Sequence, residues 1–162
     1  MIVDVIPKFL TPVTHRVIPH IASLIAKGRY GVYVLAEYSD RGPAGRAVPP
    51  TRWQRTYGDL HHSEFTVTQI ADALRNRPVV RVVKSTRSLF GTDERLTRLL
   101  RRRGIREIHI VGIETHDCVM ATALDAFDRD FITCVLSKGC ASKSPRLHRA
   151  ACTILRKVLL LR

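Results

Sequence analysis

The sequence lacks the features that mark membrane, secreted or repetitive proteins. No apolar run approaches the roughly 20 residues of a membrane-spanning helix, and Asp4 interrupts the first apolar stretch, which therefore has no signal-peptide pattern. Internal repeats, low-complexity segments and domain linkers are also missing. We therefore expect a cytoplasmic protein without membrane association, in which residues 1–162 form a single domain.

Cysteine is scarce and irregularly spaced. The four cysteines have neither the paired spacing of a zinc site nor the density of a disulfide scaffold. We interpret them as reduced thiols, in agreement with a cytoplasmic location. They are Cys118, Cys134, Cys140 and Cys152.

Acidic residues are few relative to basic ones. The chain has 14 Asp and Glu against 27 Lys and Arg, which gives a net charge of +13. The densest basic run, Arg98 to Arg106, follows acidic residues at the start of a predicted helix, as ordinary helix electrostatics favours. No RNA-binding aromatic motif, zinc finger or helix-turn-helix signature is present. The sequence therefore disfavours specific nucleic-acid binding, and attraction of anionic substrates is an alternative use of the charge.

Hydrophobic patterns alternate between strands and helices, which is typical of an α/β fold with a parallel sheet. The stretch between Tyr38 and Phe65 is long and irregular, and loops of that length in compact domains are usually functional or flexible. The predicted strands cover residues 1–4, 31–37, 78–83, 108–111, 131–136 and 158–161. The predicted helices cover residues 12–27, with a kink at Pro19, and 67–74, 92–103, 118–129 and 145–156.

The most informative segment joins the predicted strand at residues 108–111 to the following helix. Residues 112–119 read Gly-Ile-Glu-Thr-His-Asp-Cys-Val and place Cys118 at or next to a helix N-terminus. Unpaired N–H groups and the positive end of the helix dipole favour a thiolate there and could hold an oxyanion. A buried structural cysteine is the alternative for a lone thiol.

Two charged residues end other predicted strands. Asp4 ends the first strand, and Lys84 ends the strand at residues 78–83. Functional residues of parallel sheets gather at the carboxyl ends of the strands. We therefore expect Asp4, Lys84 and Cys118 to lie close together.

Here the sequence resembles the isochorismatase-like cysteine hydrolases, a family that includes nicotinamidases, carbamoylsarcosine amidohydrolases and ureido-acid hydrolases. The family's lysine segment is matched by Lys84, Ser88, Leu89, Phe90 and Thr92. Its nucleophile segment is matched by Gly112, Ile113, Thr115, Cys118, Val119, Thr122, Ala123, Asp125 and Ala126. A later segment is matched more loosely by residues 139–142, His148 and Ala151. The resemblance implies a three-layer α/β/α Rossmann-like fold with a mostly parallel sheet of about six strands.

The resemblance also implies a Cys-Asp-Lys triad. Cys118 would attack an amide or ureido carbonyl to form a thioester, and Asp4 would take the thiol proton and pass it to the leaving group. Lys84 would stabilise the charges and orient Asp4. A cis peptide bond between Ile113 and Glu114 would direct the N–H groups of Glu114 and Cys118 at the oxyanion.

Some positions depart from the family pattern. Ile6 stands where the family usually has Gln, so a hydrogen-bonding group near the site is missing. Arg87 occupies a position that is often aromatic or small, and a guanidinium there could bind a substrate carboxylate. A solvated arginine is the alternative interpretation of Arg87.

The sequence predicts no catalytic metal and no cofactor. Nicotinamidases carry a metal-binding Asp-x-His after the second strand, whereas residues 36–42 lack this motif. Asp59, His61 and His62 could substitute for it, although adjacent histidines are more often surface loop residues. Trp53 and Tyr57 could form apolar walls for a planar substrate, or Trp53 could anchor the loop instead.

The leading hypothesis is a metal-independent cysteine hydrolase that cleaves a small amide, carbamoyl or ureido compound. Isochorismate cleavage is disfavoured. It is a vinyl-ether hydrolysis, and the family members that perform it do not need the cysteine that this chain has at position 118. The first alternative is a catalytically inactive member that acts in assembly or partner binding. The second is a basic nucleic-acid-associated protein. The apolar residues 158–161 fit burial in a homo-oligomer.

Overall fold

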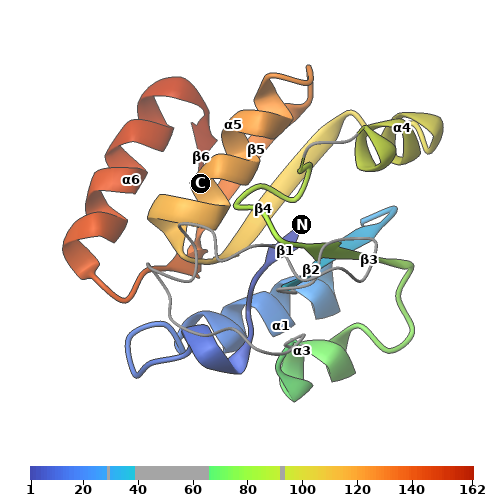
Figure 1. Cartoon of the computed structure of the whole chain (residues 1–162). Coiled ribbons are helices and arrows are strands. Elements are labelled where there is room, and N and C mark those ends of the chain that lie inside the picture. Colours follow the sequence, from blue (N-terminus) through green and yellow to red (C-terminus); the bar gives the residue numbers. More distant parts are fainter. Residues whose placement is uncertain (29, 39–65, 92–93) are drawn as a thin grey trace.

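The computed structural model describes residues 1–28, 30–38, 66–91 and 94–162. These residues form a six-stranded sheet in which every neighbouring pair is parallel, in the order β3-β2-β1-β4-β5-β6 (Figure 1). The strands are β1 (Ile2–Val3), β2 (Tyr33–Tyr38), β3 (Val79–Lys84), β4 (Glu107–Ile113), β5 (Ile132–Ala141) and β6 (Leu160–Leu161).

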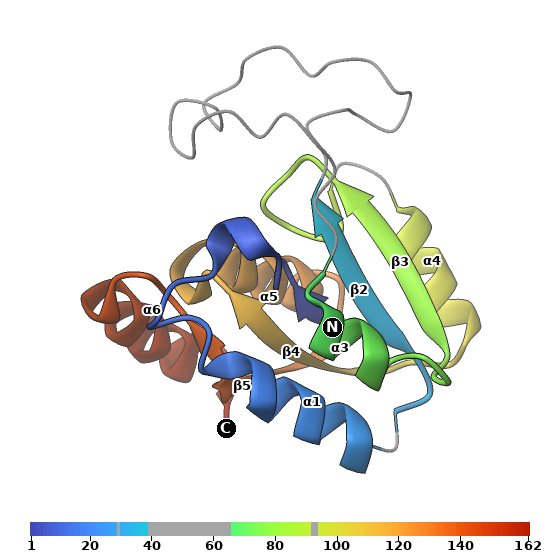
Figure 2. The same cartoon turned by 90° about the horizontal axis from the view of Figure 1, so that it is seen from below.

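Helices cover both faces of the sheet, as Figures 1 and 2 show from two directions. One face carries α1 (Val17–Lys27) and α3 (Thr68–Ala73). The other carries α4 (Arg95–Arg102), α5 (Met120–Phe127) and α6 (Pro145–Val158). Two short helical turns are η1 (Pro7–Phe9) and η2 (Thr115–Val119). The prediction of a three-layer α/β/α fold with a parallel sheet is confirmed.

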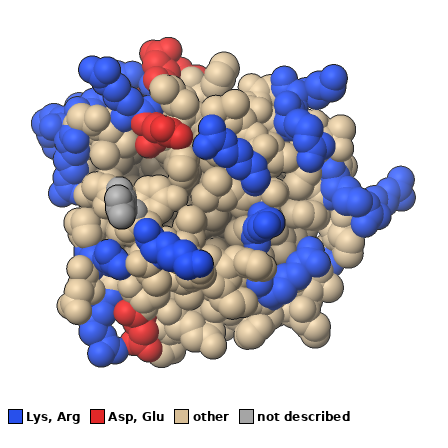
Figure 3. Space-filling model, turned by 180° about the vertical axis from the view of Figure 1, so that it is seen from behind, with Lys and Arg blue, Asp and Glu red and all other residues tan. Residues whose placement is uncertain are grey.

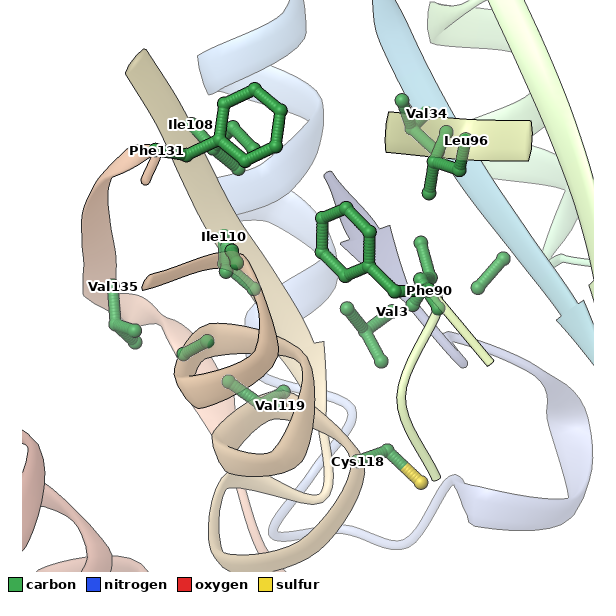
Figure 4. Close-up of a cluster of buried hydrophobic side chains, with 14 of the residues drawn as sticks. Val3, Val34, Phe90, Leu96, Ile108, Ile110, Cys118, Val119, Phe131 and Val135 are labelled. Carbon is green, nitrogen blue, oxygen red and sulfur yellow. The ribbon is translucent and has the colours of Figure 1, made fainter. Parts of the chain in front are cut away.

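Alternating side chains of the strands supply the two apolar cores. Ile2 and Val111 pack toward α1 and α3, whereas their neighbours Val3 and Ile110 pack toward α4 and α5. Successive residues of a strand point to opposite faces, so a strand buried on both faces must be apolar throughout. Figure 4 shows the second of these cores, in which Phe90 packs among the strand residues. Each fully buried aliphatic side chain contributes about 1.5–3 kcal/mol.

The predicted helix at residues 12–27 begins later, at Val17. The residues before it form turns in which the Thr14 hydroxyl donates to the Phe9 carbonyl at 2.8 Å. Pro19 therefore falls in the first turn of α1, where a missing N–H group is tolerated. The interpretation of Pro19 as a mid-helix kink was wrong for this reason.

Strand β5 is longer than the sequence predicts, because it continues to Ala141. Its pairing with β4 shifts register, from Ile110 opposite Val135 to Gly112 opposite Cys140. The stretch around Gly139 resembles a loop in sequence, and the irregularity accommodates it without ending the strand. As a result, the end of β5 lies beside the segment that carries Cys118.

Gly112 permits a close approach of β1 to β4. Its φ is +138°, and a Cβ atom there would lie 2.1 Å from the carbonyl oxygen of Val3. Val3 is the register partner of Gly112. A side chain at this position would push away β1, and with it the following residue, Asp4.

Basic side chains are spread over the surface. Figure 3 shows Lys and Arg distributed across one whole face, with few acidic residues between them. The net charge of +13 is therefore not confined to one patch of this face. Among the described residues, no helix is both long enough and apolar enough to span a membrane.

Candidate active site

Three strand ends bring Asp4, Lys84 and Cys118 together. Asp4 follows β1, Lys84 is the last residue of β3, and Cys118 lies in η2, which follows β4. The Lys84 Nζ and Asp4 Oδ2 atoms are 2.7 Å apart, and the two side chains are 2% and 0% exposed. The Cys118 thiol lies close enough to both groups that the charges of Asp4 and Lys84 each act on its pKa. The arrangement joins a thiol, a carboxylate and an ammonium group in a buried cluster.

The backbone of Asp4 is unusual. Its φ is +50°, in the left-handed region, which non-glycine residues seldom occupy. Such residues cluster at functional sites, where the surrounding structure holds them in place. Lys84 is fixed from a second side, because its ammonium also donates to the Thr86 carbonyl at 2.9 Å. The two charges are therefore held in a fixed position relative to each other.

Burial and the charge of Lys84 act on the Cys118 thiol in opposite directions. Burial raises its pKa well above the usual value, Lys84 opposes this shift, and the negative charges of Asp4 and Asp117 add to it. This direction is opposite to the one that a helix N-terminus favours, because Cys118 is only 4% exposed and lies within η2, two residues before α5. Figure 4 shows Cys118 at the edge of the apolar core, with its sulfur directed away from the core side chains. A thiol beside a carboxylate needs that carboxylate as a base in order to attack.

The turn before Cys118 has a defined backbone. The peptide bond between Ile113 and Glu114 is cis. The carbonyl of Glu114 accepts from the N–H groups of Asp117 at 3.1 Å and Val119 at 3.2 Å. Its side-chain Oε2 accepts from the Lys143 N–H at 3.1 Å. These bonds fix the segment that links β4 to η2.

An ion pair that sequence analysis missed lies next to the nucleophile. The Arg87 guanidinium donates from Nε to Oδ1 of Asp117, the residue that precedes Cys118. The Arg87 side chain is 50% exposed and that of Asp117 is 9% exposed. Burial first, and then the negative charge of Asp4, raise the pKa of Asp117 to about 6 despite this contact. The signal in the sequence was an acidic residue directly before the cysteine of the motif.

Ile6 contributes only apolar contact. It is fully buried in the core beneath α1, together with Phe9. An aliphatic side chain cannot hydrogen-bond, so the site has no polar group at the position where the resembled family carries Gln.

A cleft with a volume of about 420 Å³ lies between β3 and α4. Its lining includes Lys84 and Thr86 from the site, Phe90 from the core and Arg95 from α4. The cleft gives the site an open space next to Lys84.

Several predicted site residues lie outside the described part of the chain. Within the described ranges, no group of three or more His, Cys, Asp or Glu side chains is placed to hold a metal ion. The predicted substrate-contacting residues Trp53 and Tyr57, and the alternative metal cluster Asp59, His61 and His62, belong to the residues that the structure does not describe.

Comparisons with known proteins place the site in a family context. A family model described as the isochorismatase domain matches residues 1–160. An uncharacterised isochorismatase family protein, PncA, of Bacillus subtilis is 32% identical over 131 residues, which are 76% of this chain and 68% of that protein. The ureidoacrylate amidohydrolase RutB of Acinetobacter baylyi is 31% identical over 84 residues, which are 51% of this chain and 34% of that protein.

Solved structures of similar proteins share the fold. The nicotinamidase SaPncA from Staphylococcus aureus has a TM-score of 0.79 at 19% identity, covering 99% of this chain and 94% of that one. The nicotinamidase PncA from Bacillus subtilis has a TM-score of 0.77 at 19% identity, covering 99% and 95%. At these identities the likeness shows the fold alone.

Proposed function

The chain belongs to the isochorismatase family and is a hydrolase, and from this premise we propose that it cleaves a C–N bond of a small amide, carbamoyl or ureido compound. The buried cluster of Cys118, Asp4 and Lys84 is the observation that carries the proposal. The similarity to the ureidoacrylate amidohydrolase RutB supports it.

In the proposed mechanism, Asp4 takes the proton of the Cys118 thiol as the sulfur attacks the carbonyl carbon. The N–H groups of Glu114 and Cys118 stabilise the oxyanion. Asp4 then gives the proton to the departing nitrogen, and the amine or ammonia leaves a thioester on the sulfur. Asp4 next takes a proton from a water molecule, which attacks the thioester. The C–S bond breaks, the acid leaves, and Asp4 returns the proton to the Cys118 sulfur. Lys84 orients Asp4 through their ion pair.

Arg87 is the proposed substrate-binding residue among the described ones. Its guanidinium lies beside the nucleophile and is half exposed, so it can reach a polar group of the substrate. Asp117 orients the guanidinium through Nε, and a planar guanidinium suits bidentate binding of a carboxylate. Trp53 and Tyr57 remain proposed apolar contacts. We assign no metal, because residues 36–42 lack the Asp-x-His of nicotinamidases.

A cysteine substitution tests the proposed activity. Cys118→Ala should abolish release of ammonia or amine from a panel of nicotinamide, N-carbamoyl amino acids and ureidoacrylate, with the circular dichroism spectrum unchanged. Cys134→Ala, at the opposite end of the sheet, is the matched control and should retain turnover. A panel without any turnover that depends on Cys118 would contradict the proposal.

The second candidate is an inactive family member that serves assembly or partner binding. The loss of the hydrogen-bonding group at Ile6 favours it. Under this alternative, Asp4→Asn and Lys84→Ala would leave the alkylation rate of Cys118 unchanged. A slower rate in both variants, together with turnover, would dismiss it.

We also propose a homo-oligomer of this single-domain chain. Exposed apolar side chains surround a groove between the end of α5, the start of β5 and the end of α6, and they are Phe127, Ile132, Val158 and Leu160. Patches of this kind mark interaction sites. Sedimentation velocity of the wild type and of Ile132→Glu tests this, and a wild-type monomer would refute it.

The described cysteines are free thiols, which supports a cytoplasmic location.

A further inference from the structure

The turn that carries Cys118 is bound to helix α6 by a chain of side chains. Thr115, the first residue of η2, is completely buried. Its Oγ1 atom lies 2.9 Å from Nδ1 of His148, which belongs to α6. The other ring nitrogen of His148, Nε2, lies 3.7 Å from the Cys152 sulfur, one helical turn further along.

Charge and burial define the proton positions in this chain. Burial first, then the nearby positive charges of Arg16 and Arg149, lower the pKa of His148, so its ring is neutral at neutral pH. Burial raises the pKa of Cys152, so its sulfur keeps its proton. A neutral imidazole has one donor and one acceptor. The thiol of Cys152 and the hydroxyl of Thr115 can each donate or accept, so the ring of His148 can hydrogen-bond both neighbours at once.

The turn η2 depends on such outside contacts. It is a single π-helical turn, and π turns are rare and occur frequently at functional sites. The residues on both sides of Thr115 are also bound to the segment before α6. Oε2 of Glu114 accepts from the Lys143 N–H at 3.1 Å, and Nδ1 of His116 lies 2.9 Å from the Ser142 hydroxyl. The nucleophile turn is thus held from one side by residues 142–148.

We propose that His148 is a positioning residue, which holds Cys118 against Asp4 by fixing Thr115. This inference rests on the proposed function, because it assigns to Asp4 the role of base. Thr115 follows the proposed oxyanion residue Glu114 and precedes Cys118 by three positions, so a displacement of Thr115 moves the thiol and the oxyanion donors together. A misplacement of about 1 Å can cost roughly 100-fold in rate.

The test measures alkylation of Cys118 by iodoacetamide at one fixed pH, read by mass spectrometry, and needs no substrate. His148→Leu removes the hydrogen-bonding group, whereas His148→Asn keeps a polar amide, which can donate or accept, near the position of Nδ1. We expect His148→Leu to slow alkylation by about tenfold and His148→Asn to restore most of the rate. Thr115→Val should match His148→Leu, and the double variant should be no slower than either. The exposed His20→Leu is the matched control.

His148→Leu in an Asp4→Asn background distinguishes a positioning effect from a nonspecific disturbance of the structure around Cys118. If His148 acts by aligning the thiol with its base, His148→Leu should change the rate less than about twofold once Asp4 is gone. Equal effects in both backgrounds, or no effect in the wild-type background, would overturn the inference. If Asp4→Asn alone has no effect, the proposed triad fails and the inference fails with it. Slowing by Asp4→Asn without any slowing by His148→Leu refutes the inference and leaves the proposed function standing.

Discussion

Replacement of Lys84 by methionine should destabilise the protein strongly as well as inactivate it. Methionine has a similar length and no charge, so the change leaves Asp4 buried without its cation. The charges are 2.7 Å apart, and at an effective dielectric constant of about 20 their attraction is about 6 kcal/mol. Desolvation of both groups offsets part of this attraction, and loss of one partner of a buried pair costs about 3–5 kcal/mol. We expect the free energy of unfolding to fall by that amount.

Urea denaturation followed by circular dichroism measures the loss. Lys138→Met is the matched control, because Lys138 is an exposed lysine of β5 and should change stability by less than about 0.5 kcal/mol. The double variant Asp4→Asn, Lys84→Met should regain part of the stability, since it leaves no unpaired charge. A loss below about 1 kcal/mol for Lys84→Met would refute the reasoning that the pair is buried and coupled.

Three further predictions concern the surroundings of the site. The Asp117 carboxyl has a pKa raised from 3.8 to about 6 by folding, so its stabilising contribution is lost as the pH rises through that window. As the pH rises between these values, the free energy of unfolding of Asp117→Asn should increase by about 1–3 kcal/mol relative to that of the wild type. Thermal unfolding measures this difference, and the same pH dependence in both proteins would contradict it. Gly112→Ala should lower the free energy of unfolding by several kcal/mol in urea titration, because its Cβ atom would clash with the Val3 carbonyl. Gly104 has a φ of +68° and open space around it, so Gly104→Ala should lower that free energy by only about 1–2 kcal/mol. Alkylation of Cys118 should keep accelerating above pH 9.0, since burial raises its pKa beyond that value, and a plateau near neutral pH would show a resting thiolate instead.

The positions of the strands and of the nucleophile segment were predictable from local sequence. Apolar runs and their separations predict a parallel sheet, and the carboxyl ends of parallel strands converge. That reasoning brings Asp4, Lys84 and Cys118 together, as the structure does. The ends of helices and strands were less predictable. Turns delay the start of α1 until Val17, and a shift in the pairing of β4 with β5 lets β5 continue through Gly139.

Only the tertiary structure decided how these groups are charged and held. The protonation of Cys118 depends on its burial, which no local pattern reports, and burial reverses the effect expected from a helix N-terminus. The contact of Arg87 with Asp117 and that of Thr115 with His148 join residues about 30 positions apart. Sequence periodicity specifies which faces are apolar. The ionisation of a side chain and the choice of its partner depend instead on dielectric surroundings and distances that exist only after the elements have packed.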